Sequence, residues 1–261
     1  MKAALLSIAA AAVLSAQQPQ IENAKLESRS LKGSLASELK SSGAGPFWAA
    51  WSEPIIPRQS GDMCSWNGDG GRAAGAPVRL EGPVALVVLV RVEDSQVERI
   101  RVASGDCRFD GGGLSFYWFN GVPARDSVNW LKAQMAGRQS EQAILAISLH
   151  SGPDADRALD ELTAPGQTPR VRERAAFWLG VSRGSHGVEV LKRMLANDPD
   201  ERVKEQVIFA LSQSRDPAGI TTLIDTARHN ADPRLQKKAM FWLGQSKDPR
   251  AFDFLAQILK N

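Results

Sequence analysis

The sequence contains few of the residues from which catalytic and metal sites are usually built. It has 3 histidines and 2 cysteines among 261 residues, with no His-Glu dipeptide and no CxxC pair. These absences argue against a zinc site, and no Ser/His/Asp set for serine-hydrolase chemistry can be nominated from the sequence. We therefore expect no catalytic residue, no metal ion and no cofactor, and we place the three histidines, His150, His186 and His229, at the surface or in turns.

A glycine-rich phosphate-binding loop is also missing. The longest run of glycines, Gly111-Gly112-Gly113, lacks the lysine of a P-loop and the spacing of a dinucleotide-binding loop. We predict that it forms a tight turn.

The sequence lacks an excess of charge of one sign. It has 32 basic and 29 acidic residues, and from Gln139 to the end it has 17 basic against 16 acidic residues. A protein that neutralises a phosphate backbone needs a clear basic excess, so we expect no nucleic-acid partner. Arg170, Arg172 and Arg174 are predicted to lie on the solvated side of a helix.

Only one long apolar run is present, and it lies at the start of the sequence. Lys2 is followed by the apolar run from Ala3 to Leu14 and by the small residues Ser15 and Ala16. This pattern predicts a signal peptide over residues 1–16, cleaved after Ala16 or Ser15. The alternative is an uncleaved membrane anchor, but the run is shorter than the ~20 residues of a spanning helix. We expect a soluble protein that is periplasmic or secreted, with no stable membrane insertion after cleavage.

The two cysteines, Cys64 and Cys107, suit an exported protein. An even number of cysteines in an oxidising compartment favours a disulfide, so we predict that they are paired. Free thiols or metal ligands are the alternatives.

The last part of the chain repeats with a period of 32 residues. In the first half of each unit the equivalent apolar positions are Val171, Val203 and Leu235; Ala175, Val207 and Ala239; Phe177, Phe209 and Phe241; and Leu179, Leu211 and Leu243. In the second half they are Val188, Ile220 and Phe252; Leu191, Leu223 and Leu255; and Leu195, Ala227 and Leu259. A fainter first unit contains Ala143, Leu145, Ile147, Leu159 and Ala164. Both halves have helical spacing, so the pattern predicts about four stacked helical hairpins.

Aspartate–proline pairs mark the predicted helix starts. An aspartate N-cap followed by proline at the first helical position is a favourable start. The pairs are Asp198-Pro199, Asp216-Pro217, Asp232-Pro233 and Asp248-Pro249. Trp178 and Trp242 occupy equivalent positions two units apart, and we expect them to pack between hairpins.

The runs at 198–227 and 232–259 resemble HEAT repeats of the short type first described in phycobilin lyases. The resemblance implies a right-handed α-solenoid over residues 139–261. This fold carries scaffolds, inhibitors and a few enzymes, so it does not define an activity. One such enzyme family, the deoxyhypusine hydroxylases, holds two irons with paired His-Glu dipeptides, and the sequence has none. The resemblance therefore does not extend to that activity.

Residues 17–122 lack the repeat and are predicted to be rich in β-strand, which makes the whole chain α+β. Expected strands lie at 24–31, 47–56, 84–92, 97–103 and 114–119, with a short helix at 34–40. Residues 123–138 are predicted to form a connecting helix, capped by Asp126 or Ser127, that covers the first hairpin.

Two clusters in this N-terminal region support an alternative function. The aromatic residues are either a domain core or a face that stacks on sugars or binds peptides. The acidic residues near the cysteines offer calcium ligands, but their spacing is not that of an EF-hand. The alternative is therefore a ligand-binding protein or enzyme with a carbohydrate or metal site here. The aromatic set is Trp48, Trp51, Trp66, Tyr117 and Trp118, and the polar set is Asp62, Asn67, Asp69, Asp106 and Asp110.

The favoured interpretation is a non-catalytic protein–protein interaction scaffold of the cell envelope or secreted space. A row of second helices is predicted to form a groove of mixed polarity, which is typical of protein-binding surfaces. The groove residues are Glu189, Lys192, Arg193, Thr221, Thr222, Asp225, Asp253 and Gln257. We also expect Phe252, Phe254 or Ile258 to be partly uncovered on the last hairpin, where a partner or a second copy docks.

Overall fold

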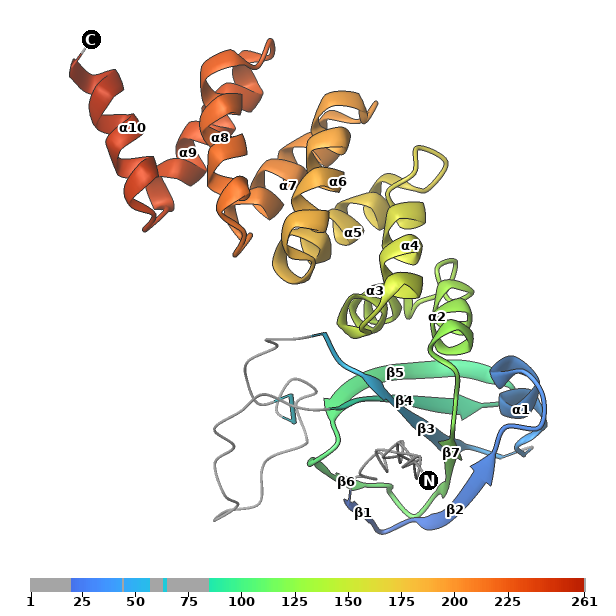
Figure 1. Cartoon of the computed structure of the whole chain (residues 1–261). Helices are drawn as coiled ribbons and strands as arrows, with labels where there is room; N and C mark the ends of the chain where they lie inside the picture. The colour runs from blue at the N-terminus through green and yellow to red at the C-terminus, as the bar shows by residue number, and fades with distance from the viewer. Residues whose placement is uncertain (1–19, 44, 57–62, 65–84, 261) are drawn as a thin grey trace, which may run out of the picture.

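A computed structural model describes residues 20–43, 45–56, 63–64 and 85–260. The predicted signal peptide lies outside the described residues. The N-terminal part contains the β-sheets and one short helix, and the helices from Ala124 onward extend away from it as one arm toward the C-terminus (Figure 1). The change from strand to helix falls between Asn120 and Ala124.

The main sheet has five strands in the order β2-β7-β3-β4-β5. Strands β3, β4 and β5 run antiparallel, whereas β2 and β3 both run parallel to β7. The bounds are β2 (Lys25–Ser30), β3 (Phe47–Pro54), β4 (Ala85–Glu93), β5 (Gln96–Ser104) and β7 (Ser115–Asn120). A separate parallel pair joins β1 (Gln20–Glu22) to β6 (Arg108–Asp110). The predicted strands are all present, as their alternating or β-branched patterns indicate.

The strands expected at 84–92 and 97–103 form an antiparallel hairpin, β4 with β5. Asp94 and Ser95 connect the strands, with φ values of 48° and 60°. Positive φ at both central residues of a two-residue connection matches the twist of antiparallel strands.

The central strands of the sheet are buried on both faces, so they alternate between two cores. One face buries Phe47, Ala49 and Trp51 of β3 in the core that the helices share. The opposite face buries Ala50 of β3, together with residues from β4 and β7 and both cysteines. Because side chains of a strand alternate with period 2, one strand supplies both cores. Helices α1 (Leu35–Ser41), α2 (Ala124–Lys132) and α3 (Ser140–Leu149) contribute to the first core.

The β5 edge of the sheet is closed by a side chain. Gln139, just before α3, donates from Nε2 to the carbonyl oxygen of Glu98 at 2.8 Å. Its Oε1 accepts from the backbone nitrogen of Ile100 at 3.1 Å. The side-chain amide thus satisfies one donor and one acceptor of the edge strand, as a neighbouring backbone would.

The connecting helix is present but shorter than predicted, and its predicted caps are wrong. Helix α2 begins at Ala124, and Pro123 is its N-cap residue without a side-chain cap hydrogen bond. The prediction of Asp126 or Ser127 as the cap was wrong, because Ser127 is buried and accepts a hydrogen bond from Trp51. The helix also ends at Lys132 rather than at residue 138.

Four helical hairpins follow, which confirms the 32-residue repeat. Their first helices pack side by side in the order α3, α5, α7 and α9. The equivalent core positions Ala175, Val207 and Ala239 are fully buried. The pairs are α3 with α4 (Pro153–Leu162), α5 (Pro169–Ser182) with α6 (Gly184–Asn197), α7 (Glu201–Ser212) with α8 (Pro217–His229), and α9 (Pro233–Gln245) with α10 (Pro249–Lys260).

Most predicted helix caps are confirmed. Asp216 and Asp232 are the N-caps of α8 and α9, and each accepts from the backbone nitrogen two residues ahead at 2.8 Å. Asp248 accepts from the backbone nitrogen of Arg250 at 2.9 Å in the same way. The prediction for Asp198 was wrong, because Asp200 caps α7.

Asp198 instead takes part in a buried ion pair between helices. Both of its carboxylate oxygens accept from Arg172, at 2.8 Å from Nε and 3.0 Å from Nη2. Asp198 also accepts from the backbone nitrogen of Asp200 at 2.9 Å. Arg172 is buried, so the prediction that it lies on the solvated side of its helix was wrong. A bidentate pair of this kind fixes both geometry and charge at the α5–α7 boundary.

Two close approaches hold the hairpins at short range. A Cβ atom at Gly180 would collide with the carbonyl oxygen of Ala210 on α7, and one at Gly187 would collide with that of Leu179. Aromatic rings continue this packing along the first helices. Phe177 stacks on Phe209 with 5.9 Å between ring centres, and Phe209 contacts Trp242 at 4.7 Å.

Candidate functional site

The predicted disulfide is present, and it makes a metal site at the cysteines unsuitable. Cys64 and Cys107 are bonded, with 5.3 Å between their Cα atoms. Asp106 lies next to them, but oxidised sulfurs are not the thiolates that bind metals. Asp62, Asn67 and Asp69 of the proposed calcium set lie outside the described residues.

Asp110, the last member of the acidic set, has a structural role. It accepts from the backbone nitrogen of Gly112 at 2.8 Å and from Nδ2 of Asn23 at 2.9 Å. These two hydrogen bonds, the first being the stronger cause, lower the pKa of Asp110. Gly112 and Gly113 have φ values of 63° and 76°, so the predicted tight turn is confirmed.

The described aromatic residues of the N-terminal region do not form one binding face. Trp51 is buried toward the helices and meets Trp130 edge-on at 5.6 Å. Trp118 is buried on the opposite face, where Trp48 packs half-buried beside it. Tyr117 is half-buried, with the guanidinium carbon of Arg29 3.7 Å from its ring centre. Trp66 lies outside the described residues. Trp51 and Trp118 are therefore core residues, which favours the domain-core interpretation of this set over the alternative of a sugar-stacking face.

The expectation that all three histidines lie at the surface or in turns fails for His150. His186 and His229 are exposed and pair with Asp160 and Asp225. His150 is buried where the sheet meets α2 and α3, and sequence reasoning gave no sign of this.

His150 ends a buried chain of hydrogen bonds. Trp51 donates from Nε1 to Ser127 Oγ at 2.8 Å, and Ser127 lies 2.8 Å from His150 Nε2. His150 Nδ1 lies 2.7 Å from the carbonyl oxygen of Ala146. A neutral ring with its proton on Nδ1 satisfies every contact, because Nε2 then accepts from the serine hydroxyl. Burial is the main cause that lowers the pKa of His150 to about 4.

This serine–histidine pair is structural rather than catalytic. Both side chains are buried from solvent, so a substrate does not reach Ser127 Oγ. The ring is oriented by a carbonyl oxygen and not by the carboxylate of a triad. Backbone contacts pass through the same point: Ser151 donates to the carbonyl of Pro54 at 2.9 Å. We call this meeting point of β3, α2 and α3 the junction.

Glu53 is a second buried ionisable group near the junction. It lies on β3 and is almost fully buried. Burial raises its pKa to about 8, and its Oε1 has no hydrogen-bond partner among the described residues. Glu53 is therefore protonated at neutral pH in the folded protein.

The predicted groove residues of the second helices are mostly exposed. Thr222 is the exception: it is buried, and its hydroxyl donates to the carbonyl of Ala218 at 2.7 Å. Its place in the predicted set was wrong, because the hydroxyl folds back on its own helix. The exposed members are Glu189, Lys192, Arg193, Thr221, Asp225, Asp253 and Gln257.

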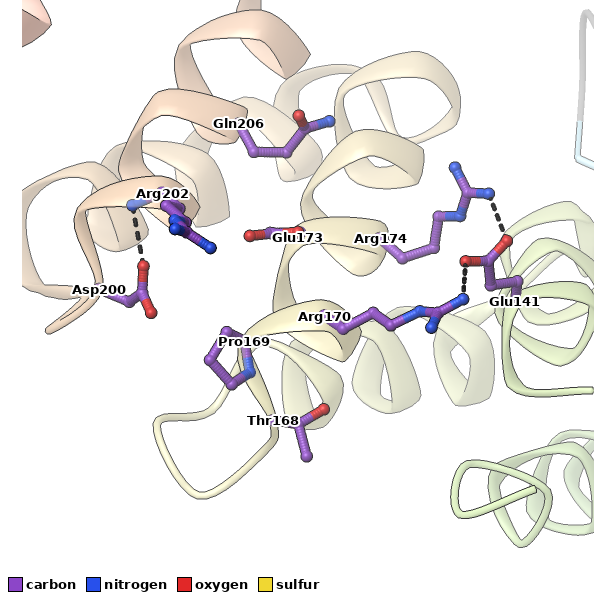
Figure 2. A pocket seen from close by; sticks show the side chains of 9 residues that line it. All are labelled: Glu141, Thr168, Pro169, Arg170, Glu173, Arg174, Asp200, Arg202 and Gln206. Atoms are coloured by element: carbon purple, nitrogen blue, oxygen red, sulfur yellow. Dashed lines mark hydrogen bonds and ion pairs between the residues drawn. The ribbon is translucent and has the colours of Figure 1, made fainter. Parts of the chain in front are cut away.

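A different groove opens across the N-terminal ends of the first helices α5 and α7 (Figure 2). Its volume is about 690 Å³. Glu141 reaches it from α3 and binds Arg170 and Arg174, each at 2.8 Å. Three arginines and three acidic residues line the groove, so it favours neither charge. The lining residues are Glu141, Thr168, Pro169, Arg170, Glu173, Arg174, Asp200, Arg202 and Gln206.

Ion pairs join α3 to α5 and α7 to α9, and we call this series the ladder. The groove lies between α5 and α7, where the ladder lacks a pair among the described residues. Glu141 and Glu205 each bind a cation 33 residues ahead, Arg174 and Lys238, at 2.8 and 2.9 Å. Glu173 is the equivalent carboxylate on α5, but the residue 33 ahead is Gln206. In the part of the chain that the structure describes, no ion pair joins Glu173 to α7. The 32-residue spacing of Glu141, Glu173 and Glu205 is the sequence signal that marks these ion-pair positions.

The last hairpin has an uncovered outer side. Phe252 and Leu259 of α10 are 73% and 87% exposed, whereas their equivalents Val188 and Leu195 on α6 are 0% and 9% exposed. Phe241 on α9 is exposed as well. These comparisons confirm that Phe252 is uncovered, as predicted for the last hairpin.

Phe254 was wrongly included in that prediction. It is buried, with the guanidinium carbon of Arg228 4.9 Å from its ring centre. Ile258 is partly exposed, as predicted.

A glycine marks the same uncovered side. Gly244 is equivalent to Gly180, which lets the next hairpin approach closely, yet no atom lies within 4 Å of a Cβ built at Gly244. We call Phe241, Gly244, Phe252 and Leu259 the terminal face.

Comparison with known proteins identifies the repeats. A family model of HEAT repeats matches residues 155–239, and one of the PBS lyase HEAT-like repeat matches residues 235–261. No curated protein matches the chain. Within the described residues, no helix is both long and apolar enough to cross a membrane. The C-terminal region of this chain therefore consists of HEAT-like repeats, preceded by a strand-rich N-terminal region.

Proposed function

We propose that the protein is a non-catalytic scaffold that binds other proteins through its HEAT-like repeats. HEAT repeats commonly mediate protein interactions, and a stack of hairpins offers long surfaces for that purpose. The observation that carries the proposal is the terminal face. Its residues are exposed, yet they are apolar like the equivalent residues that are buried between hairpins inside the array. Exposed apolar patches of this kind mark interaction sites.

The neutral groove between α5 and α7 is a second surface of the type that proteins bind. Equal numbers of acidic and basic residues line it, so it does not select an anion or a cation. Mixed polar surfaces are typical of non-obligate protein interfaces.

We propose further that the protein works outside the cytoplasm. The N-terminal pattern predicts export, and a disulfide such as Cys64–Cys107 persists in oxidising compartments. Mass spectrometry of the protein from the envelope or medium of the producing cell tests this. The expected mature chain begins at Gln17 and contains the oxidised cysteines, and an intact Met1 with free thiols would contradict export.

The scaffold proposal is tested by capture from envelope extract. The double variant Phe252→Ser, Leu259→Ser removes the apolar part of the terminal face without touching the core. Leu26→Ser is the matched control, because Leu26 is an exposed apolar residue of β2, far along the chain. We expect the terminal variant to lose the proteins that the wild type and the control retain. The same captured set from all three proteins would sink the proposal that this face docks partners.

A further inference from the structure

We infer that the partner of the terminal face is a second copy of this chain, bound through a two-fold axis with the two α10 helices antiparallel. This inference rests on the proposed function and names the occupant of the same surface.

The first argument is the equivalence between the terminal face and the inner contacts of the array. The absence of a Cβ at Gly180 lets the backbone of Ala210 on the next hairpin pack closely against it. Gly244 is the equivalent glycine, and no atom packs against it. Phe209 rests on Trp242 of the following hairpin, whereas Phe241 is 55% exposed. Inside the array this side of one hairpin meets the opposite side of the next. The equivalence therefore shows that the surface accepts another helix, and a second copy supplies one in its own α10.

The second argument is the apolar pattern of α10. Phe252 and Leu259 are seven residues apart, so they lie on one side of the helix, about two turns from each other. In an antiparallel pair, Phe252 of one copy faces Leu259 of the other, and the two-fold axis repeats the contact. Each exposed apolar side chain then gains an apolar neighbour.

The third argument is charge. Asp253 lies near the start of α10 and Lys260 at its end, also seven residues apart, and both are exposed on the same flank of the apolar pair. An antiparallel two-fold arrangement places Asp253 of each copy beside Lys260 of the other. A parallel two-fold arrangement places these flanks on opposite sides of the helix pair, so it forms neither ion pair. Self-complementarity of this kind is what a two-fold interface requires.

Sedimentation of the purified full chain tests the inference, from about 1 to 200 µM protein. We expect a reversible dimer. Asp253→Lys and Lys260→Asp each turn two attractions into repulsions, so each should weaken the dimer about 10-fold. The double reversal Asp253→Lys, Lys260→Asp restores opposite charges and should return the affinity to within about 3-fold of the wild type.

Two further variants serve as controls. Phe252→Glu with Leu259→Glu should give a monomer over the whole range, and circular dichroism checks that it stays folded, because both side chains are exposed in the structure. Glu189→Lys makes a charge reversal on α6, away from the terminal face, and should leave the dimer unchanged.

Several outcomes would overturn the inference. A wild type that remains monomeric removes the second copy as the occupant, and a dimer that survives Phe252→Glu with Leu259→Glu lies elsewhere on the molecule. A double charge reversal that stays as weak as the single ones rejects the antiparallel arrangement. Sedimentation reports only self-association, whereas capture reports which other proteins are lost with the terminal face, so failure of this inference is distinguishable from failure of the scaffold proposal.

Discussion

The junction and the repeat array are held together in different ways. At the junction, Trp51 reaches Ser127 across 76 residues of sequence, and the contact occurs once. In the array, the contacts join neighbouring hairpins across 33 residues of sequence, as for Arg174 with Glu141 and Lys238 with Glu205. A repeat array distributes its stability over similar interfaces. The junction concentrates it in a few residues, so single substitutions should have larger and wider effects there.

The most severe way to break the junction is Trp51→Ala. This change removes a fully buried ring, its edge-on contact with Trp130 and its hydrogen bond to Ser127. We expect a loss of about 4 kcal/mol in the free energy of unfolding, measured by urea denaturation. Amide exchange should accelerate in β3 and in α3 together. A loss confined to the sheet would contradict the view that the junction couples the two regions.

Removing one partner of the buried ion pair should destabilise the array at the boundary between α5 and α7. Arg172→Met leaves the carboxylate of Asp198 buried without its cation, at an expected cost of about 3 kcal/mol. Adding Asp198→Asn removes that charge and keeps an acceptor for the backbone of Asp200, so it should recover part of the loss. Thermal unfolding of the two variants gives the comparison. Faster amide exchange should begin at α7 and spare the sheet.

The contribution of the junction to the free energy of unfolding should depend on pH, because two buried ionisable groups, His150 and Glu53, lie there. The pKa of His150 is lowered to about 4, so the unfolded chain binds more protons and this group weakens folding as pH falls below about 6.5. The pKa of Glu53 is raised to about 8, so this group weakens folding as pH rises from about 4.5 to 8. Between about pH 5 and 7 the two effects oppose each other, at about 2 kcal/mol each.

Glu53→Gln tests this balance. Without the carboxyl group, the His150 effect is unopposed, and the free energy of unfolding should rise by about 2 kcal/mol from about pH 5 to 7. The wild type should change much less over the same range. Urea titrations at both pH values measure the difference, and parallel profiles for the two proteins would contradict the assignment of these pKa values.

The smallest effects concern the ladder on the first helices. Glu141→Gln removes two exposed ion pairs and should cost about 0.5 to 1 kcal/mol. Gln206→Lys places a cation opposite Glu173, as Lys238 is placed opposite Glu205, and should gain about 0.3 kcal/mol. Differential scanning calorimetry at low and high salt distinguishes these effects, since salt screens surface pairs. A change of equal size at high salt would mean that packing, not charge, is responsible.

The array was predictable from the sequence because each hairpin meets the same kind of neighbour. The spacing of Val171, Val203 and Leu235 reflects one contact repeated three times, so the pattern is visible without coordinates. Local choices were less certain. Asp198 and Asp200 both suit an N-cap, and only the position of Arg172 across the boundary decides between them.

The junction and the terminal face were harder to predict for different reasons. Whether His150 is buried depends on how the sheet packs on α2 and α3. The residues next to His150 in the sequence do not indicate this packing. On α10, Phe252 and Phe254 are both apolar, and the orientation of the helix against α8 decides which one is covered. The disulfide was predictable from the cysteine count alone, whereas the order β2-β7-β3 brings together strands far apart in the chain.

The side chain of Gln139 should also protect the protein against aggregation through the edge of its sheet. By occupying the Glu98 carbonyl and the Ile100 amide, it denies part of the β5 edge to any foreign strand. Open strand edges are templates for aggregation. The other edge, β2, carries the charged residues Lys25, Glu27 and Arg29, which discourage such pairing. Unwanted fibre-like growth from the sheet is thus opposed at both ends, while the helical arm remains open for contact.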